Sequence, residues 1–220
     1  SLLGRFRAFA RAFPSLRERR PGAVPEPASR ESGPVKVWAF SELHKVNPQT
    51  GALLEKGPIW TSNVNLTGAR NEFVAFQAAI ESETPVKDIA VTVDEPLFAS
   101  CKLPPVFRKS GATRVYREWM VPDDKDTSEA RPWYPDALIP LNGAFDLPAP
   151  ENGVPRQRVQ PVFVDIYIPR DASAGTHHGS ISVRAAGQLL RKIGITVEVL
   201  PFSYQFVDHT AAREAGTVDD

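Results

Sequence analysis

The chain has 220 residues and a formal net charge of zero, and its hydrophobic and charged fractions, 42% and 24%, are ordinary for a soluble globular protein. This length holds one large all-β domain or two small domains, and the 21 prolines and 14 glycines favour many turns over long helices. No apolar run approaches the roughly 18 residues that span a bilayer, so the sequence does not predict an integral membrane protein.

The first 33 residues differ in composition from the rest of the chain. Residues 1–20 carry six Arg and one Glu, a charge of +5, which leaves −5 for the remainder and argues against a globular body that binds nucleic acid. Leu2, Phe6, Phe9 and Phe13 follow one helical face, which predicts a short basic amphipathic helix or arm. Weak contact with an anionic membrane surface, the remnant of an export segment, and a frayed arm are the open alternatives. The proline-rich stretch that follows predicts a linker, with a domain boundary near residue 33.

Beyond this boundary, apolar side chains recur at the two-residue period of strands. β-Branched and aromatic enrichment with this alternation predicts seven strands, at 35–40, 72–81, 88–94, 114–121, 161–169, 179–185 and 192–200. A short hairpin at 186–188 is expected to join the last two. Seven or eight strands without helices between them predict an all-β fold, a two-sheet antiparallel β-sandwich that is Ig/fibronectin-like or jelly-roll-like. We expect the sandwich to span residues 34–203, and 204–220 to be a tail or the start of a catalytic domain.

The segment from Pro122 to Gln160 shows neither helical nor strand periodicity, although it contains the aromatic stretch RPWYPDALIPLNGAF. Long ordered loops inside compact domains are usually functional. Trp133, Tyr134 and Asp136 combine flat apolar faces with hydrogen-bonding tips, which are typical of surfaces that contact a sugar or a protein partner. The alternative is that Trp133 folds back over the sandwich, where an open end of the core would be covered by Leu138, Ile139 and Leu141.

Acidic side chains offer two weak candidates for chemistry. Asp94 and Glu95 form an adjacent pair at the end of an expected strand, and paired carboxylates can hydrolyse glycosides, but this sequence is also an ordinary turn. Asp123, Asp124 and Asp126 crowd one loop without the pattern of an EF-hand, so we expect a solvated acidic loop rather than a calcium site. The sequence therefore predicts no catalytic residue in this chain.

Metal ligands are equally sparse. Cys101 is the only cysteine, which excludes an intrachain disulfide and a cysteine-based zinc site. His177 and His178 are neighbours in an expected strand, so their rings point to opposite faces and do not readily share one ion. No metal site and no cofactor are predicted.

Several stretches together resemble a known family. The stretches are ARNEFVAFQ at 69–77, RVYREWMVP at 114–122, WYPDALIPL at 133–141 and PVFVDIYIPRDASAGTHHGSISV at 161–183, followed by LPF at 200–202. They resemble the N-terminal β-sandwich of glycoside hydrolase family 123 and of its relatives in domain-of-unknown-function family 4091. The PxDAxAGxxxGxIxV pattern is common in bacterial sandwich modules, whereas ARNExxxFQ followed by YPDxLxP is a sharper combination.

The resemblance implies an accessory role. In that family a (β/α)₈ barrel follows the sandwich and carries an Asp-Glu pair that acts on N-acetylgalactosaminides by substrate assistance, so Asp94-Glu95 inherits no catalytic role here. We expect a non-catalytic domain of a carbohydrate-active protein, without enzyme activity of its own, that packs against a catalytic barrel or borders its active site. The alternatives are an autonomous carbohydrate-binding module that uses Trp133 and Tyr134, and a structural or surface-attachment module that docks through residues 1–20. An extracytoplasmic or secreted location is also suspected from the resemblance.

Overall fold

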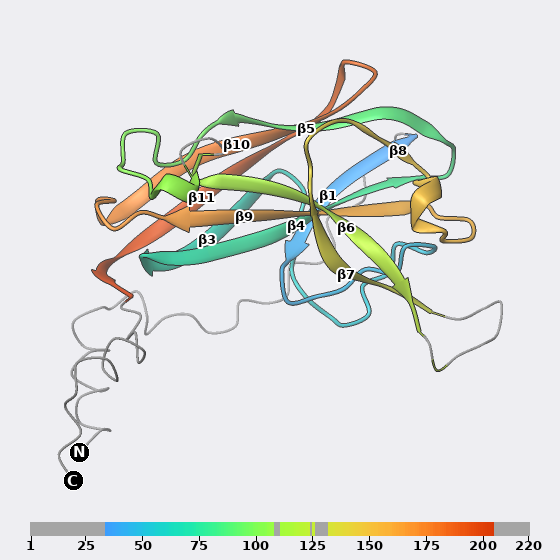
Figure 1. Ribbon diagram of the computed structural model, residues 1–220, viewed down its shortest axis with the longest axis horizontal. Coiled ribbons are helices and arrows are strands. Elements are labelled where there is room, and N and C mark those ends of the chain that lie inside the picture. The colour runs from blue at the N-terminus through green and yellow to red at the C-terminus, as the bar shows by residue number, and fades with distance from the viewer. Residues whose placement is uncertain (1–33, 108–110, 124, 126–131, 205–220) are drawn as a thin grey trace, which may run out of the picture.

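The computed structural model describes residues 34–107, 111–123, 125 and 132–204; the predicted basic arm and the C-terminal tail lie outside them. Two β-sheets pack face to face (Figure 1). The strands are β1 (Val35–Ser41), β2 (Ile59–Trp60), β3 (Asn63–Arg70), β4 (Glu72–Ser82), β5 (Val86–Glu95), β6 (Thr113–Pro122), β7 (Trp133–Pro140), β8 (Phe145–Leu147), β9 (Val159–Ile168), β10 (Gly175–Ala185) and β11 (Gln188–Ser203). Two short 3₁₀ helices, η2 (Pro105–Phe107) and η3 (Pro150–Asn152), lie in connections.

The strand order confirms the predicted two-sheet sandwich. The six-stranded sheet runs β2-β1-β4-β9-β6-β7, and the five-stranded sheet runs β3-β11-β10-β5-β8. All seven strands predicted from the sequence are present. The pairing differs from a purely antiparallel arrangement in one place, because β3 pairs in parallel with β11, from Asn63↔Gly194 to Gly68↔Val199.

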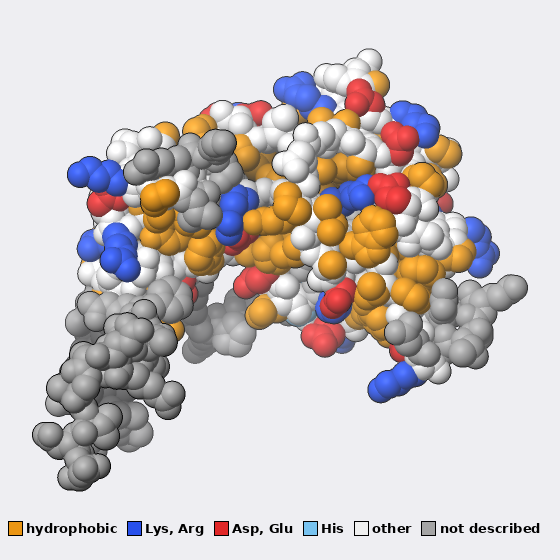
Figure 2. Space-filling model, viewed as in Figure 1, with side chains coloured by type: hydrophobic (Ala, Val, Ile, Leu, Met, Phe, Trp, Pro, Cys, Tyr) orange, Lys and Arg blue, Asp and Glu red, His pale blue; other side chains and the backbone are white. Residues whose placement is uncertain are grey.

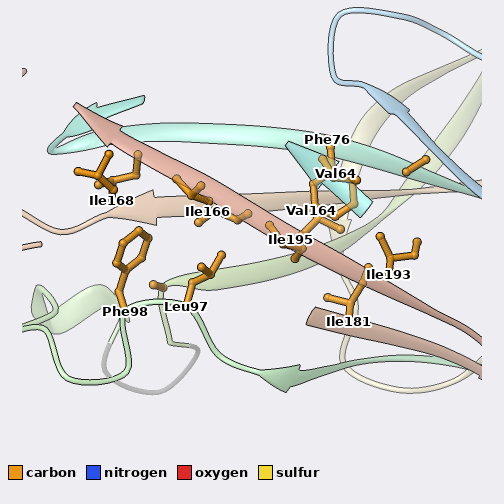
Figure 3. Packing of buried hydrophobic residues seen from close by; sticks show 14 of the residues in the cluster. Val64, Phe76, Leu97, Phe98, Val164, Ile166, Ile168, Ile181, Ile193 and Ile195 are labelled. Atoms are coloured by element: carbon orange, nitrogen blue, oxygen red, sulfur yellow. The ribbon is translucent and has the colours of Figure 1, made fainter. Parts of the chain in front are cut away.

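The two-residue alternation fills the space between the sheets. Ile193, Ile195 and Val197 of β11 are at most 2% exposed, and they share one cluster with Phe76 of β4 and Ile166 of β9 (Figure 3). Burying each such side chain contributes about 1.5–3 kcal/mol relative to leaving it in water. The alternating apolar positions therefore supply the main stabilising term of the fold.

The expectation that the segment from Pro122 to Gln160 builds no regular element is wrong. Its residues form β7, β8 and η3, and β9 already begins at Val159. Prolines are tolerated in an edge strand because one side of the strand makes no ladder, and β7 is an edge strand that contains Pro135 and Pro140. A register shift opposite Trp119 and Met120 further disturbs the alternation, which hides the strand from a periodicity argument.

The connection between β1 and β2 covers part of the outer face of the six-stranded sheet. There a second apolar cluster forms from Trp38, Phe40, Val46, Ala79 and Val159, with Leu53 and Ile59 packed against it. The connection folds on itself through a bridge between Val46 and Leu53. This cover brings the residues just after β1 above β4, and so builds one wall of the site described below.

Between the sheets, the side of the sandwich flanked by β5 and β6 is hollowed. A groove of about 530 Å³ is lined by Val91, Val93, Thr113, Arg114, Val115, Tyr116, Pro140, Leu141 and Asn142. β8 pairs with β5 only at Val86 and Ile89, which leaves the later half of β5 uncovered along this edge. Hydrophobic side chains accordingly gather across the centre of the molecule in Figure 2, with most charged side chains around them.

The predicted hairpin between β10 and β11 is present, and it gives a first test of the fold. Ala186 and Gly187 form its turn with φ angles of 46° and 78°, the pair of positive values that type I′ turns require and that Asn-Gly adopts most readily. Ala186→Asn is therefore expected to raise the free energy of unfolding by about 0.5–1 kcal/mol, measured by urea denaturation. Gly187→Ala is the matched control: its added methyl meets no atom within 4 Å, so its expected loss of about 1 kcal/mol reports backbone strain alone. A less stable Ala186→Asn variant would contradict the turn assignment.

Candidate functional site

A pocket on the outer face of the six-stranded sheet gathers titratable side chains from separate segments. Its lining consists of Glu42, His44, Lys45, Gln77, Glu118, Pro135, Asp136, Leu138 and Phe163, and its volume is about 170 Å³; we call it the Glu118 pocket. Gln77 and Phe163 are directly paired across β4 and β9, and their neighbours in the chain point into the core. The alternation of the strands therefore directs both side chains outward, toward the residues that follow β1.

β6 places Glu118 where its ladder with β9 ends. Pairing of the two strands reaches Arg117↔Val162, and the next residue of β9, Pro161, has no N–H to donate. The side chain of Gln160 supplies the missing donor instead, because its Nε2 lies 2.8 Å from the carbonyl oxygen of Glu118. The backbone of Glu118 is thus held by a side chain rather than by the sheet.

Gln160 also anchors the segment between β8 and β9. It is fully buried, and its Oε1 accepts hydrogen bonds from Asn152 Nδ2 at 2.9 Å and from Gln157 Nε2 at 3.0 Å. Gln157 Oε1 in turn accepts the backbone N–H of Ala149 at 2.9 Å. These three amide side chains connect η3 and its flanks to the strand that carries Glu118.

The carboxyl group of Glu118 is buried, with the residue only 5% exposed, and accepts no hydrogen bond from the residues that the structure describes. Burial in a poorly hydrated site raises the pKa of Glu118 to about 8, and the positive charge of Lys45 opposes the rise only in part. At neutral pH the group therefore holds its proton. It can donate one hydrogen bond, or it can ionise when a cation approaches.

Gln77 leaves a hydrogen-bond acceptor unused beside this carboxyl. Its Nε2 donates to the carbonyl oxygens of Ser41 at 3.2 Å and His44 at 2.7 Å. Both amide hydrogens are thereby occupied, which fixes the orientation of the side chain. Its Oε1 is buried and has no donor within the described residues. A buried acceptor without a donor costs roughly 1–3 kcal/mol, which is why such an atom calls for a ligand or a water.

His44 and Lys45, from the segment after β1, form one wall of the Glu118 pocket. The His44 ring packs directly against Gly57, where any larger residue would overlap it, and its Nδ1 lies 3.8 Å from the Glu55 carboxylate. Lys45 Nζ lies 3.9 Å from Asp136 Oδ1, and both side chains are about half exposed or more. An exposed pair of this kind contributes less than about 1 kcal/mol, so Lys45 is not held in place over Glu118.

The structure does not bring Trp133, Tyr134 and Asp136 into one surface. Trp133 is 7% exposed and packs with Met120 and Val154, so its ring is not presented for stacking. Tyr134 is half-buried, and Asp136 is exposed and lines the Glu118 pocket. The contact role of these residues stays a prediction.

Asp94 and Glu95 lie at the end of β5, as expected, and have structural partners. Asp94 accepts hydrogen bonds from the hydroxyl groups of Ser182 and Thr92, and Glu95 pairs with Lys192 at 2.8 Å. The hydrogen bond from Lys192, with its positive charge, lowers the pKa of Glu95 below its usual value. An exposed carboxylate held in its ionised form is poorly suited to act as a general acid.

The histidine pair and the acidic loop form no metal centre where the structure describes them. His177 Nε2 lies 2.9 Å from the carbonyl oxygen of Ser173, whereas His178 Nδ1 lies 3.4 Å from Thr196 Oγ1, so the rings have separate partners. Among the described residues, no three His, Cys, Asp or Glu side chains are grouped to hold a metal ion. Asp124 and Asp126 fall outside that part of the chain.

None of the described helices has the length and the hydropathy to cross a bilayer.

Glu118 and Gln77 were not identified from the sequence. Both stand at outward positions of predicted strands, where a polar residue is the ordinary expectation. The available signal was weak: Gln77 lies in the otherwise apolar run FVAFQAAI, so an amide in that run indicated a specific hydrogen-bond partner. The cover that buries both residues comes from the segment after β1, whose packing no local pattern reveals.

Comparison with known proteins gives a likeness in fold. No protein-family model and no curated protein matches the chain. Among solved structures, a family 123 glycoside hydrolase from Clostridium perfringens, analysed for glycolipid glycan hydrolysis, matches with a TM-score of 0.57 and 12% sequence identity. The match covers 78% of this chain and 28% of that chain. The N-terminal domain of PorA matches with a TM-score of 0.31, 13% identity and coverage of 76% of this chain and 99% of that chain, a similarity too low to carry an argument. The first likeness supports a distant fold relationship with a glycoside hydrolase and, at this identity, concerns the fold alone.

Proposed function

We propose that the sandwich is a non-catalytic accessory domain of a carbohydrate-active protein. The likeness to part of a family 123 glycoside hydrolase carries this proposal, because the matched portion is 28% of an enzyme that is much longer than the match. Fold does not fix function by itself. The paired and exposed state of Asp94 and Glu95 supports the same conclusion, since neither has the environment of a catalytic acid.

The edge strand β7 is the surface that we propose for contact with a catalytic barrel. Residues 136–140 are all exposed, and Leu138 and Ile139 each leave 42% of their surface in water. Apolar side chains on an exposed edge strand are unusual in a protein that stands alone, because they invite association. Asp136 and the half-buried Tyr134 would border this contact.

Hydrolysis of 4-nitrophenyl N-acetyl-β-galactosaminide tests the absence of catalysis. We expect no release of nitrophenol above the buffer rate at any pH from about 4 to 8, a range that begins near the usual pKa of carboxyl groups. Turnover that disappears in Asp94→Asn or Glu95→Gln would reject the accessory role, because those carboxylates would then be catalytic.

Calorimetric titration with oligosaccharides that contain N-acetylgalactosamine separates the accessory role from an autonomous carbohydrate-binding module. We expect no heat of binding from the isolated chain. Binding that Tyr134→Ala abolishes and Tyr204→Ala preserves would favour the binding module, since both tyrosines are surface-accessible but only Tyr134 belongs to β7. Surface attachment through residues 1–20 remains a proposal, because those residues lie outside the described part of the chain. The extracytoplasmic location also remains a proposal.

A further inference from the structure

Two side chains that line the Glu118 pocket carry oxygens that accept no hydrogen bond from a described residue. Glu118 is 5% exposed and Gln77 is 3% exposed, and both line the cavity. Gln77 Oε1 is held in place by the two hydrogen bonds that its Nε2 donates, yet it receives none from any described residue. Gln77 and Glu118, which lie on different strands, thus bring two oxygens to one cavity, and neither accepts a hydrogen bond from a described residue. The fitting ligand is a group rich in N–H donors.

The charges that face the cavity favour a cation. Glu42 and Asp136 add carboxylates at the rim, and the basic groups are Lys45 and His44. Lys45 lies against Asp136, and His44 lies against the Glu55 carboxylate outside the cavity. Both basic groups therefore already lie near a carboxylate, and the Glu118 carboxyl has no basic side chain in contact with it. An anion would meet the like charge of Glu42 and Asp136 at the rim, which disfavours it.

The remaining walls are apolar and the volume is small. Phe163, Leu138 and Pro135 complete the lining, and an aromatic side chain and a carboxyl group at one cavity favour an ammonium group. The cavity volume of about 170 Å³ leaves room for a short carbon chain that ends in an ammonium group.

We propose that the Glu118 pocket binds an alkylammonium group. The nitrogen is held by the Glu118 carboxylate and by Gln77 Oε1, and the carbon chain lies along Phe163 and Leu138. Such a group is carried by a small free amine or by a lysine side chain of another protein, and the two sources share this chemistry. The pocket shares Asp136 and Leu138 with the edge strand β7 that we propose for contact with a catalytic barrel, but the inference is argued from Glu118 and Gln77 and is tested on the isolated chain.

The test is a pH titration of the chain labelled with ¹³C at its glutamate carboxyl carbons, with and without n-butylammonium chloride. Because the cation binds the ionised carboxylate, a concentration ten times the Kd is expected to lower the pKa of Glu118 by about one unit. Butan-1-ol, and sodium chloride at equal ionic strength, should leave it unchanged. A pKa of Glu118 that does not move with butylammonium, or that moves equally with the alcohol, overturns the proposal.

Variants locate the site. Glu118→Gln is expected to weaken n-butylammonium binding at pH 8.5 at least tenfold, whereas Glu198→Gln, an exposed glutamate on β11, should leave it unaltered. Equal binding by Glu118→Gln would place the amine elsewhere and refute the inference. The peptide acetyl-Gly-Lys-Gly-amide then distinguishes the sources: tighter binding than butylammonium supports a lysine side chain, equal or weaker binding supports a free amine, and no binding of either contradicts the site.

Discussion

Glu118→Gln is expected to raise the free energy of unfolding at pH 9 by about 4 kcal/mol relative to wild type, while at pH 5 the two proteins should differ little. The pKa of Glu118 is raised from 4.5 to about 8 by burial, so the folded chain keeps a proton that the unfolded chain releases. Between these values the folded form binds more protons. Stability of the wild type is therefore greatest below pH 4.5, falls as the pH rises toward 8, and stays reduced above it. Glutamine keeps the shape of the protonated acid and removes the titration.

Urea denaturation of both proteins at intervals from pH 5 to pH 9 measures the effect, and the difference between the two curves isolates the contribution of this one residue. Glu198→Gln serves as the control, because its side chain is exposed and its substitution should shift the free energy by a constant small amount. Parallel curves for wild type and Glu118→Gln would show that the carboxyl is solvated in both states.

Gln160→Leu should lower the free energy of unfolding by about 3 kcal/mol or more. Leucine has nearly the same volume as glutamine, so the loss reports hydrogen bonds rather than a cavity. The substitution deprives the carbonyl of Glu118, the amide of Asn152 and the amide of Gln157 of their partner, in a place with no access to water. Each buried polar group left without a partner costs about 1–3 kcal/mol.

Gln49→Leu is the matched control for this network. Gln49 lies on the cover between β1 and β2, is only partly buried, and makes one side-chain hydrogen bond to the carbonyl of Pro155 at 2.9 Å. Its expected loss is below about 1 kcal/mol. Equal losses from the two substitutions, measured by urea denaturation at pH 7, would mean that the buried amides contribute no more than a surface hydrogen bond.

The interior of the sandwich could be predicted from the sequence because its strands are buried on one face only. Ile193, Ile195 and Val197 alternate without interruption, and each lies in the core. β3 carried the same signal, since Val64 and Leu66 alternate with Asn63 and Asn65, but the short run of apolar residues did not distinguish it from a loop. β7 gave no such signal because an edge strand with prolines and a register shift does not alternate.

The Glu118 pocket could not be predicted, for a different reason. Its chemistry depends on burial of Glu118 and Gln77, and that burial comes from packing between segments far apart in the chain. Sequence reasoning did identify Asp136, which lies at the rim, but for a role on an aromatic surface that Trp133 does not share. Local patterns report the face on which a side chain stands. They do not report what covers that face.

The parallel pairing of β3 with β11 affects how the protein is made. β11 lies between β3 and β10, and Val64 of β3 is paired with Ile195, so the five-stranded sheet joins segments from opposite ends of the described chain. Contacts of such long sequence separation slow folding, because the intervening chain must be ordered before they form. On the ribosome, β3 is synthesised early, and its partner β11 is synthesised only after nearly all the other strands of the sandwich. During that interval its apolar residues are exposed to chaperones and to aggregation, and a nascent chain cut short before residue 188 would leave β3 permanently unpaired.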